Sequence, residues 1–335
     1  MLETLNKYYE DGWLIKQTHP TLPLIIWNYS QTTQYEGKWD DVTLQCRGLV
    51  TDTDGNVVAR PFKKFFNMEE DKHTPTSEFD VYEKMDGSLI IVFWYEGGWV
   101  VASRGSFTSE QAVAASKIFF DKLDHNFSIG ITYLFEFTAK WNRIVVDYGD
   151  EDNLTLLGAI RTDDETEATY EQLEMIARGA NCNVVKRYDG IKDYSTLKGI
   201  IKDNQEGFVI RFSNGDRMKI KGEEYLRLHK IMTEVSTKSV WEVLSNGDNM
   251  EDLLKDVPDE FYTKIKEYEN ELVNEFNKIK DTYEWFFSLM QKNDRKHFAF
   301  SAKEVKHPSI LFSMLDGKDV SPLIWKIIQP EFRKL

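Results

Sequence analysis

The pentapeptide Lys84-Met85-Asp86-Gly87-Ser88 precedes the apolar run 89–95, and these two stretches decide how the chain folds. A turn at 96–98 separates that run from a second β-prone run at 99–103, which predicts a β-hairpin directly after the lysine. A lysine amine has an ordinary pKa of about 10.4, and it becomes a nucleophile where nearby positive charge or a metal lowers that pKa. Gly87 lets the backbone approach a ligand closely. Five such residues are also typical of a polar turn before a strand, so their meaning depends on the rest of the chain.

The bulk composition is that of an ordinary globular protein. With 335 residues, of which 41% are hydrophobic and 29% charged, the chain is long enough for two domains. A net charge of −14 argues against a protein that coats nucleic acid without specificity. No apolar run is long enough to cross a bilayer, the start does not resemble a secretory signal, and Cys46 and Cys182 indicate neither a disulfide framework nor a metal cluster. We therefore expect a cytoplasmic protein, in the host cytoplasm if a phage encodes it.

The pattern of apolar residues changes near residue 235. Before it, short strands and turns prevail, with hairpin signals at 54–56 and 213–216. Helices are expected at 109–123, with Ser109 as N-cap, and at 170–178, ending at Gly179. After residue 235, apolar residues recur every three or four positions, which is the helical period. The sequence thus predicts an α+β fold, with an antiparallel-sheet domain over residues 1–235 and a smaller all-α domain over residues 236–335.

Charged residues on expected strands supply groups that can act together with the lysine. Arg47 and Lys64 are suited to phosphate, the arginine through its bidentate fork. Glu136 lies between Phe135 and Phe137, so alternation places its carboxylate on the opposite face from both rings. A functional partner for it is a ribose hydroxyl or a metal. An outward-facing glutamate on a half-exposed strand fits the segment equally well.

The last charged residues of interest lie in one expected hairpin. Glu206 precedes the strand 207–212, and alternation places Lys219 and Lys221 on one face of the strand 217–221. Two adjacent ammonium groups repel each other unless they share an anion, although a solvated strand edge also carries lysines. Along the chain the order is an upstream arginine, the lysine, two glutamates and then the Lys-x-Lys strand. Covalent nucleotidyl transfer needs these groups, because the amine attacks the α-phosphate, carboxylates hold a divalent metal and cations stabilise phosphate charge.

These blocks resemble those of the covalent nucleotidyltransferase superfamily of polynucleotide ligases and capping enzymes, and in particular the T4 RNA ligase 1 family. The resemblance spans residues 44–222, and 294–317 is similar to the helical C-terminal domain of that family. Arg104 stands where the family has a lysine. The blocks that carry the resemblance are Lys84-Met85-Asp86-Gly87-Ser88-Leu89, Cys46-Arg47-Gly48, Arg60-Pro61-Phe62-Lys63-Lys64-Phe65-Phe66-Asn67, Ser103-Arg104-Gly105-Ser106, Phe135-Glu136-Phe137 with Asn142-Arg143-Ile144-Val145, Glu206-Gly207-Phe208-Val209 and Met218-Lys219-Ile220-Lys221.

The resemblance implies an ATP-grasp-like nucleotidyltransferase (ligase) domain and a helical domain that selects RNA. It implies an ATP-dependent RNA ligase that joins 5′-phosphate and 3′-hydroxyl RNA ends through lysyl-AMP and RNA-adenylate intermediates, in RNA repair and with tRNA as one candidate substrate. Lys84 is the implied nucleophile, and Glu206 and Glu136 are the implied ligands of Mg2+, with Mn2+ as an alternative metal. The implied nucleotide-binding residues are Arg47, Lys64, Glu83, Lys84, Glu136, Lys219 and Lys221, and the lysine loop is supported by Asp86, Gly87 and Arg104.

The expected partners are RNA ends and an end-healing kinase-phosphatase that acts upstream, with no membrane and a monomeric chain. Three other interpretations stay open. A DNA ligase or a capping-type nucleotidyltransferase shares the lysine, glutamate and Lys-x-Lys pattern, but helices rather than a β-barrel are expected after residue 221. A non-catalytic RNA-end-binding protein would retain the cations without the chemistry. A structural α+β protein would carry the same residues as surface turns.

Overall fold

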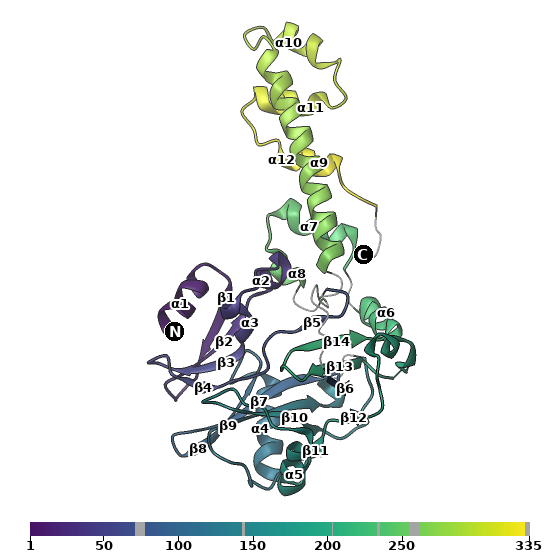
Figure 1. Cartoon of the computed structure of the whole chain (residues 1–335). Helices are drawn as coiled ribbons and strands as arrows, with labels where there is room; N and C mark the ends of the chain where they lie inside the picture. The colour runs from purple at the N-terminus through teal and green to yellow at the C-terminus, as the bar shows by residue number, and fades with distance from the viewer. Residues whose placement is uncertain are drawn as a thin grey trace. The chain divides into compact units, whose positions relative to one another are not determined.

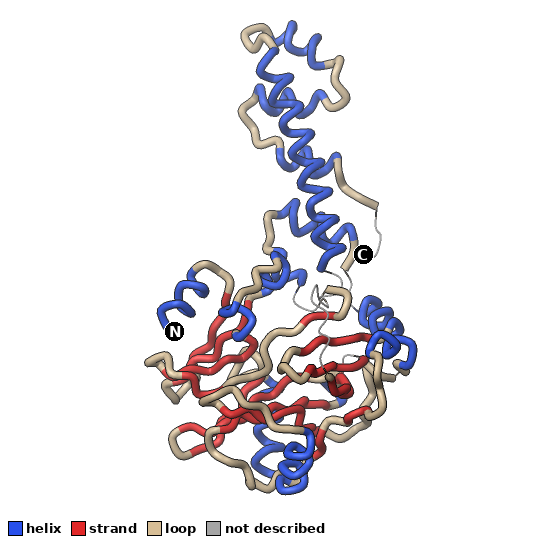
Figure 2. The backbone as a smooth tube through the Cα atoms, viewed as in Figure 1, coloured by secondary structure: helices blue, strands red, loops and turns tan. Residues whose placement is uncertain are grey.

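The computed structural model describes residues 1–70, 78–142, 145–202, 204–232, 235–254, 257 and 262–331. The chain divides into two compact units, Met1–His229 and Lys230–Leu335, a few residues before the boundary predicted at 235. Mixed strands and helices form the first unit and helices the second, which confirms the α+β prediction (Figure 2). Arg143 and Ile144, from one of the blocks quoted above, lie outside the described residues.

Three β-sheets form the described part of the first unit (Figure 1). Their strand orders are β1-β2-β3-β4, β11-β10-β9-β7-β8 and β12-β6-β13-β14-β5. Paired strands are antiparallel except at β10–β11 and β14–β5. The strands are β1 Leu14–Thr18, β2 Leu24–Tyr29, β3 Arg47–Asp52, β4 Val57–Ala59, β5 Phe66–Asn67, β6 Phe79–Lys84, β7 Ser88–Tyr95, β8 Gly98–Ser103, β9 Ile131–Thr138, β10 Asn153–Arg161, β11 Asn183–Val184, β12 Arg187–Tyr188, β13 Gly207–Phe212 and β14 Arg217–Lys221.

Helices of the first unit precede and connect these strands. They are α1 Leu2–Glu10, α2 Gln31–Glu36, α3 Asp41–Gln45, α4 Glu110–Lys122 and α5 Tyr170–Ala180, with the 3-10 helices η1 Lys140–Asn142 and η2 Tyr194–Ile200. A further helix, α6 Glu223–Met232, begins in the first unit and crosses the boundary at Lys230. Ser109 caps α4 as predicted, since its hydroxyl accepts from the Ala112 N–H at 3.2 Å. The predicted end of α5 at Gly179 is wrong. The helix continues to Ala180, and Asn181 takes the left-handed cap position with φ 53°, because asparagine tolerates that region.

Alternation directs the two faces of the second sheet into different hydrophobic cores. On β9, Phe135 and Phe137 pack in one core with buried residues of α4 and α5. Leu134, on the other face, packs in a second core with residues of the first sheet such as Val50. Glu136 therefore lies on the Leu134 face, as predicted from the period of two.

The third sheet has one apolar face and one polar face. Val81, Ile210 and Met218 form one cross-strand row and are buried in a core that the η2 segment covers. The rows on either side of it point to the opposite face, where Lys84 and Lys221 lie. Burial of one face thus fixes the register of these strands, because a shift by one residue would exchange the faces.

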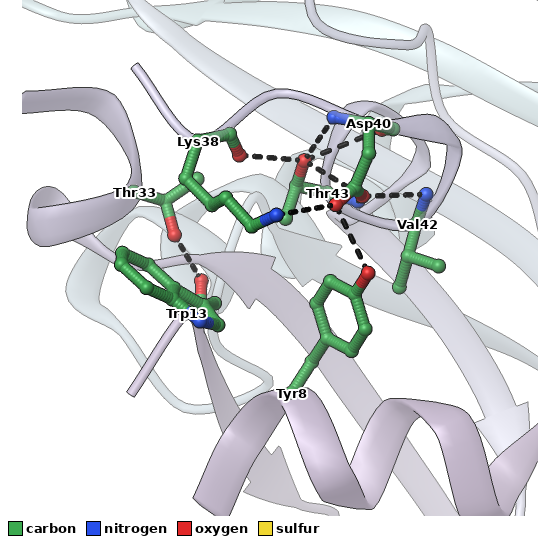
Figure 3. A network of polar contacts seen from close by, with 7 residues as sticks. All are labelled: Tyr8, Trp13, Thr33, Lys38, Asp40, Val42 and Thr43. Atoms are coloured by element: carbon green, nitrogen blue, oxygen red, sulfur yellow. Dashed lines mark hydrogen bonds and ion pairs between the residues drawn. The ribbon is translucent and has the colours of Figure 1, made fainter. Parts of the chain in front are cut away.

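A polar network fixes the segment between α2 and β3 (Figure 3). Asp40 caps α3 by accepting from the Val42 and Thr43 N–H groups at 3.1 and 3.0 Å. Its other carboxylate oxygen accepts from the Tyr8 hydroxyl at 3.0 Å, and the Lys38 ammonium lies 3.5 Å away. The network holds the chain that leads from this capped helix into β3.

The second unit is built from helices around its own core. Phe298, Ile310, Leu311 and Ile324 are fully buried there. Pro308 begins a helix, because the first helical turn needs no N–H from that residue. No helix in the described ranges is long and apolar enough to cross a membrane. The helices are α7 Thr237–Asn246, α8 Met250–Leu254, α9 Tyr262–Leu289, α10 Arg295–Ala302, α11 Pro308–Leu315 and α12 Ser321–Ile327.

Candidate active site

Strand register brings the predicted nucleophile and one predicted phosphate-binding lysine into a single row. Lys84, at the end of β6, pairs with Gly207 at the start of β13, and Gly207 pairs in turn with Lys221 at the end of β14. Paired residues of neighbouring strands point to the same face, so both ammonium groups leave the sheet on one side. Between them lies a glycine, which has no side chain.

Glu206 connects the two lysines across this gap. Its Oε2 accepts from Lys84 Nζ at 2.8 Å, and its Oε1 lies 3.5 Å from Lys221 Nζ. Glu206 is only 3% exposed, so it is not the surface turn residue that its place in the sequence allowed. A buried carboxylate needs pairing with positive charge, and here Lys84 and Lys221 both pair with Glu206.

Two glycines are required by close backbone contacts at the site. A Cβ on Gly207 would lie 1.9 Å from the Ile220 carbonyl oxygen, and the φ of Gly207 is +153°. A Cβ on Gly87 would lie 2.3 Å from the Phe137 carbonyl oxygen and 3.1 Å from Cγ of Glu136. The lysine loop is thus pressed against the end of β9, which carries the second predicted carboxylate.

Asp86 holds the lysine loop in place. The buried carboxylate accepts from the Val145 and Val146 N–H groups at 2.7 and 2.8 Å through one oxygen, and from the Tyr225 hydroxyl at 3.0 Å through the other. Its own N–H donates to the Tyr148 hydroxyl at 2.8 Å. Both carboxylate oxygens are therefore engaged by protein donors, which fits a supporting residue and not a metal ligand.

Glu136 lies close to these charges. Desolvation raises its pKa to about 8, although the charges of Lys84 and Arg47 favour its ionised form. The Glu206 and Asp86 carboxylates oppose ionisation further. A cation bound beside Glu136 and Glu206 would relieve this repulsion.

The donor set fits a metal that is held mainly by its waters and by a ligand. No group of three or more His, Cys, Asp or Glu side chains in the described ranges is arranged to hold a metal ion. Mg2+ in nucleotide sites is typically bound by one or two carboxylates together with phosphates and water. Glu136 and Glu206 match that arrangement.

Two of the other predicted cations, Lys64 and Arg104, lie near the Tyr29 ring. Lys64 is buried, and its Nζ lies 5.5, 5.3 and 5.3 Å from the ring centres of Tyr29, Trp39 and Phe66. Arg104 is exposed and approaches the same tyrosine, with its guanidinium 5.6 Å from the ring centre. These cations and Lys84 all belong to the first unit.

Lys219 lies two residues before Lys221 and therefore on the same face of β14. It is buried, and β14 is flanked by β13 and β5, so the alternative of a solvated strand edge is wrong. Glu83 differs from the other predicted residues, because alternation places its side chain on the opposite face from Lys84. Its backbone N–H donates to the Lys186 carbonyl at 2.9 Å.

A cavity of about 520 Å3 lies beside the segment 60–66. Lys64 and Arg217 line it, whereas Lys84 and Glu206 do not. The cavity and the lysine–carboxylate cluster are therefore different parts of the unit. The cavity walls carry both signs of charge, since Glu165 pairs with Arg60 at 3.1 Å.

Sequence reasoning did not find several residues that shape the site. The aromatic side chains of Tyr29, Trp39 and Phe66 enclose Lys64, and Tyr148 and Tyr225 hold Asp86. Phe66 lay inside a quoted block. The two tyrosine hydroxyls are distant from Asp86 in sequence, and no spacing rule connects them with it.

Comparison with known proteins places these features in a family. Residues 45–235, more than half of the chain, match the family model for RNA ligases of the T4 RNA ligase 1 type. A protein of Autographa californica nuclear polyhedrosis virus, described as a bifunctional polynucleotide kinase/RNA ligase, is 28% identical over 62% of this chain. The aligned region is 34% of that protein, so the chain spans about a third of its length. An RNA ligase of Rhodothermus phage RM378 is 21% identical over 82% of each chain.

Solved structures with partial likeness are also ligases. A Naegleria gruberi RNA ligase mutant with ATP and Mn has a TM-score of 0.37 at 15% identity, over 46% of this chain and 52% of that one. An archaeal ATP-dependent RNA ligase has a TM-score of 0.49 at 12% identity, over 78% of this chain and 69% of that one.

Proposed function

Because this chain belongs to the RNA ligase family, we propose that it is an ATP-dependent RNA ligase with Lys84 as its nucleophile. The observation that carries the proposal is the row Lys84, Gly207 and Lys221, with Glu206 bridging the two ammonium groups at 2.8 and 3.5 Å. An amine, a second cation and a buried carboxylate meet in this row.

The proposed reaction has three steps. The Lys84 amine forms a bond to the α-phosphorus of ATP, the bond to the β-phosphate oxygen breaks, pyrophosphate leaves with the electron pair, and the ammonium proton passes to solvent. A 5′-phosphate oxygen of RNA then displaces Lys84 from the α-phosphorus, and the amine regains a proton. In the last step a 3′-hydroxyl attacks the activated 5′-phosphorus, which forms the phosphodiester and releases AMP and a proton.

In this proposal the other residues bind the phosphates and the metal ion, and they position the lysine loop. The phosphates are bound by Lys219, Lys221, Arg47 and Lys64, and the exposed Arg104 adds positive charge. Glu206 and Glu136 would hold Mg2+ or Mn2+, which supplies positive charge against the developing phosphate charge. Asp86 and Gly87 keep the lysine loop against β9, and the Glu83 backbone would reach the adenine.

Labelled AMP transfer tests the proposal. With α-labelled ATP and magnesium, the wild type should become covalently labelled and Lys84→Ala should not. Lys122→Ala, at the exposed end of α4, is the matched control and should label normally. Undiminished label in Lys84→Ala would refute the assignment. The absence of label from the wild type would favour a non-catalytic RNA-end-binding protein.

We also propose that the second unit selects the RNA substrate. Trp285 and Phe300 are 58% and 73% exposed, and exposed aromatic rings are suited to stacking on unpaired bases. Ligation should be compared on single-stranded RNA, nicked duplex DNA and an RNA cleaved in its anticodon loop. Trp285→Ala should slow RNA ligation and leave lysyl-AMP formation unchanged. Preferred sealing of nicked DNA would favour a DNA ligase instead.

The proposed reaction requires 5′-phosphate and 3′-hydroxyl ends. An end-healing kinase-phosphatase would supply them from ends of the opposite polarity. The name of the viral relative combines a polynucleotide kinase with an RNA ligase, which supports such a partnership. Broken RNA with a 5′-hydroxyl should be sealed by this protein only after phosphorylation.

A further inference from the structure

The side-chain amide of Asn67 is buried without a hydrogen-bond partner. The residue is 3% exposed, and neither its Oδ1 nor its Nδ2 is satisfied within the described residues. The Asn67 backbone N–H donates to Glu70 Oε2 at 3.2 Å, but this bond does not involve the side-chain amide. A buried amide in this state is costly, because it loses its bonds to water and gains none in return.

The register of β5 places this amide on the face that carries Lys84. Asn67 pairs in parallel with Lys219, and Lys219 shares its face of β14 with Lys221. Asn67 therefore lies beside Lys219, at the far edge of the row of cations. Three strand spacings of about 4.8 Å separate β5 from β6, so Asn67 is too distant to contact the atom that Lys84 attacks.

We propose that Asn67 binds the pyrophosphate half of ATP, the group that leaves when Lys84 is adenylated. The inference rests on the function proposed above. Lys221 and Lys219 lie between Lys84 and Asn67, so the phosphates that follow these cations away from the α-phosphorus extend towards the amide. The amide N–H edge fits a phosphate oxygen, and its carbonyl edge fits the adjacent Lys219 ammonium. Asn67 is thus a binding residue for the leaving group.

Asn67→Leu separates this role from a structural one. The substitution keeps the shape and removes an unsatisfied amide, so the melting temperature should stay the same or rise. The KM for ATP in lysyl-AMP formation should rise about 10- to 100-fold, the loss expected for a hydrogen bond to a charged group. Ligation of pre-adenylated RNA without ATP should be unchanged, because that reaction involves no pyrophosphate.

Asn126→Leu is the matched control. The Asn126 amide donates to the Gly179 carbonyl at 2.8 Å, so its loss should lower the melting temperature and leave the KM for ATP unchanged. Asn67→Asp, which keeps the size and adds a negative charge, should raise the KM for ATP even if the leucine variant does not fold.

Three results would overturn the inference. An unchanged KM for ATP in both Asn67 variants would exclude the contact. Equal losses with ATP and with pre-adenylated RNA, together with a lower melting temperature, would make Asn67 a structural residue. A loss confined to pre-adenylated RNA would assign the amide to the RNA phosphate. Failure of the wild type to form lysyl-AMP would contradict the proposed function itself and is recognised separately.

Discussion

Removal of the Asp86 carboxylate should lower the free energy of unfolding of the first unit and leave its magnesium requirement unchanged. In Asp86→Ala, the buried Val145 and Val146 N–H groups lose their acceptor, at about 1–3 kcal/mol each, and the Tyr225 hydroxyl loses its partner. The total of about 3–7 kcal/mol is comparable with the whole stability of many domains. Asp86→Asn keeps an oxygen for the two N–H groups, so it should cost only about 1–2 kcal/mol.

Urea unfolding and magnesium titration of lysyl-AMP formation would check this expectation. Tyr225→Phe removes a single hydrogen bond and should cost about 1 kcal/mol, which calibrates the series. The midpoint of unfolding should fall in the order Tyr225→Phe, Asp86→Asn, Asp86→Ala, with an unchanged magnesium requirement in the variants that fold. A normal unfolding midpoint in Asp86→Ala, combined with a higher magnesium requirement, would show that Asp86 is a metal ligand and that our reasoning is wrong.

Three further substitutions test other parts of the site. Gly87→Ala drives a Cβ against the Phe137 carbonyl oxygen and should cost roughly 1–3 kcal/mol and most lysyl-AMP formation, whereas Gly98→Ala, which points into open space, should change neither the melting temperature nor labelling. The pKa of Glu136 is raised from 4.5 to about 8, so its ionisation destabilises the fold increasingly between these pH values. Urea unfolding should therefore show Glu136→Gln gaining stability over the wild type from pH 4.5 to 8, and an equal difference at pH 4 and pH 8 would contradict the cause. Burial of Glu167 opposes its negative charge, but Arg217 and Arg211 outweigh burial and hold the pKa of Glu167 below 4.5. The ionised carboxylate therefore contributes its full stability above pH 4.5, and this contribution is lost as the pH falls through the lowered pKa. Glu167→Gln should cost roughly 1–3 kcal/mol at pH 7 and much less in strong acid, as measured by unfolding at both pH values.

Period-two and helical patterns predicted most of the fold. Strand faces followed from alternation, because a residue such as Phe135 can be buried on one face only while Glu136 takes the other. Helix ends were less predictable. Gly179 and Asn181 both satisfy the sequence rule for a left-handed cap, and the structure selects Asn181.

The site was predictable as a set of residues but not as a geometry. Order along the chain identified Lys84, Glu206 and Lys221 through a family resemblance. The contacts between these residues depend on which strands pair in the sheet, and the order of residues along the chain does not determine strand pairing. The side-chain amide of Asn67 is an example of what the sequence does not predict. Its lack of a hydrogen-bond partner depends on the folded surroundings and not on the neighbouring residues in the sequence.

The bond between Lys84 and Glu206 joins residues that are 122 positions apart. A ribosome adding about 5–20 residues per second takes roughly 6–24 seconds to make the chain between them. During that interval Lys84 has been made while its carboxylate partner has not. The row through Gly207 is completed by Lys221 later still, so a nascent or truncated chain that ends before residue 221 lacks the second cation that pairs with Glu206. The row of Lys84, Gly207 and Lys221 is therefore complete only after nearly all of the first unit, Met1–His229, has been made.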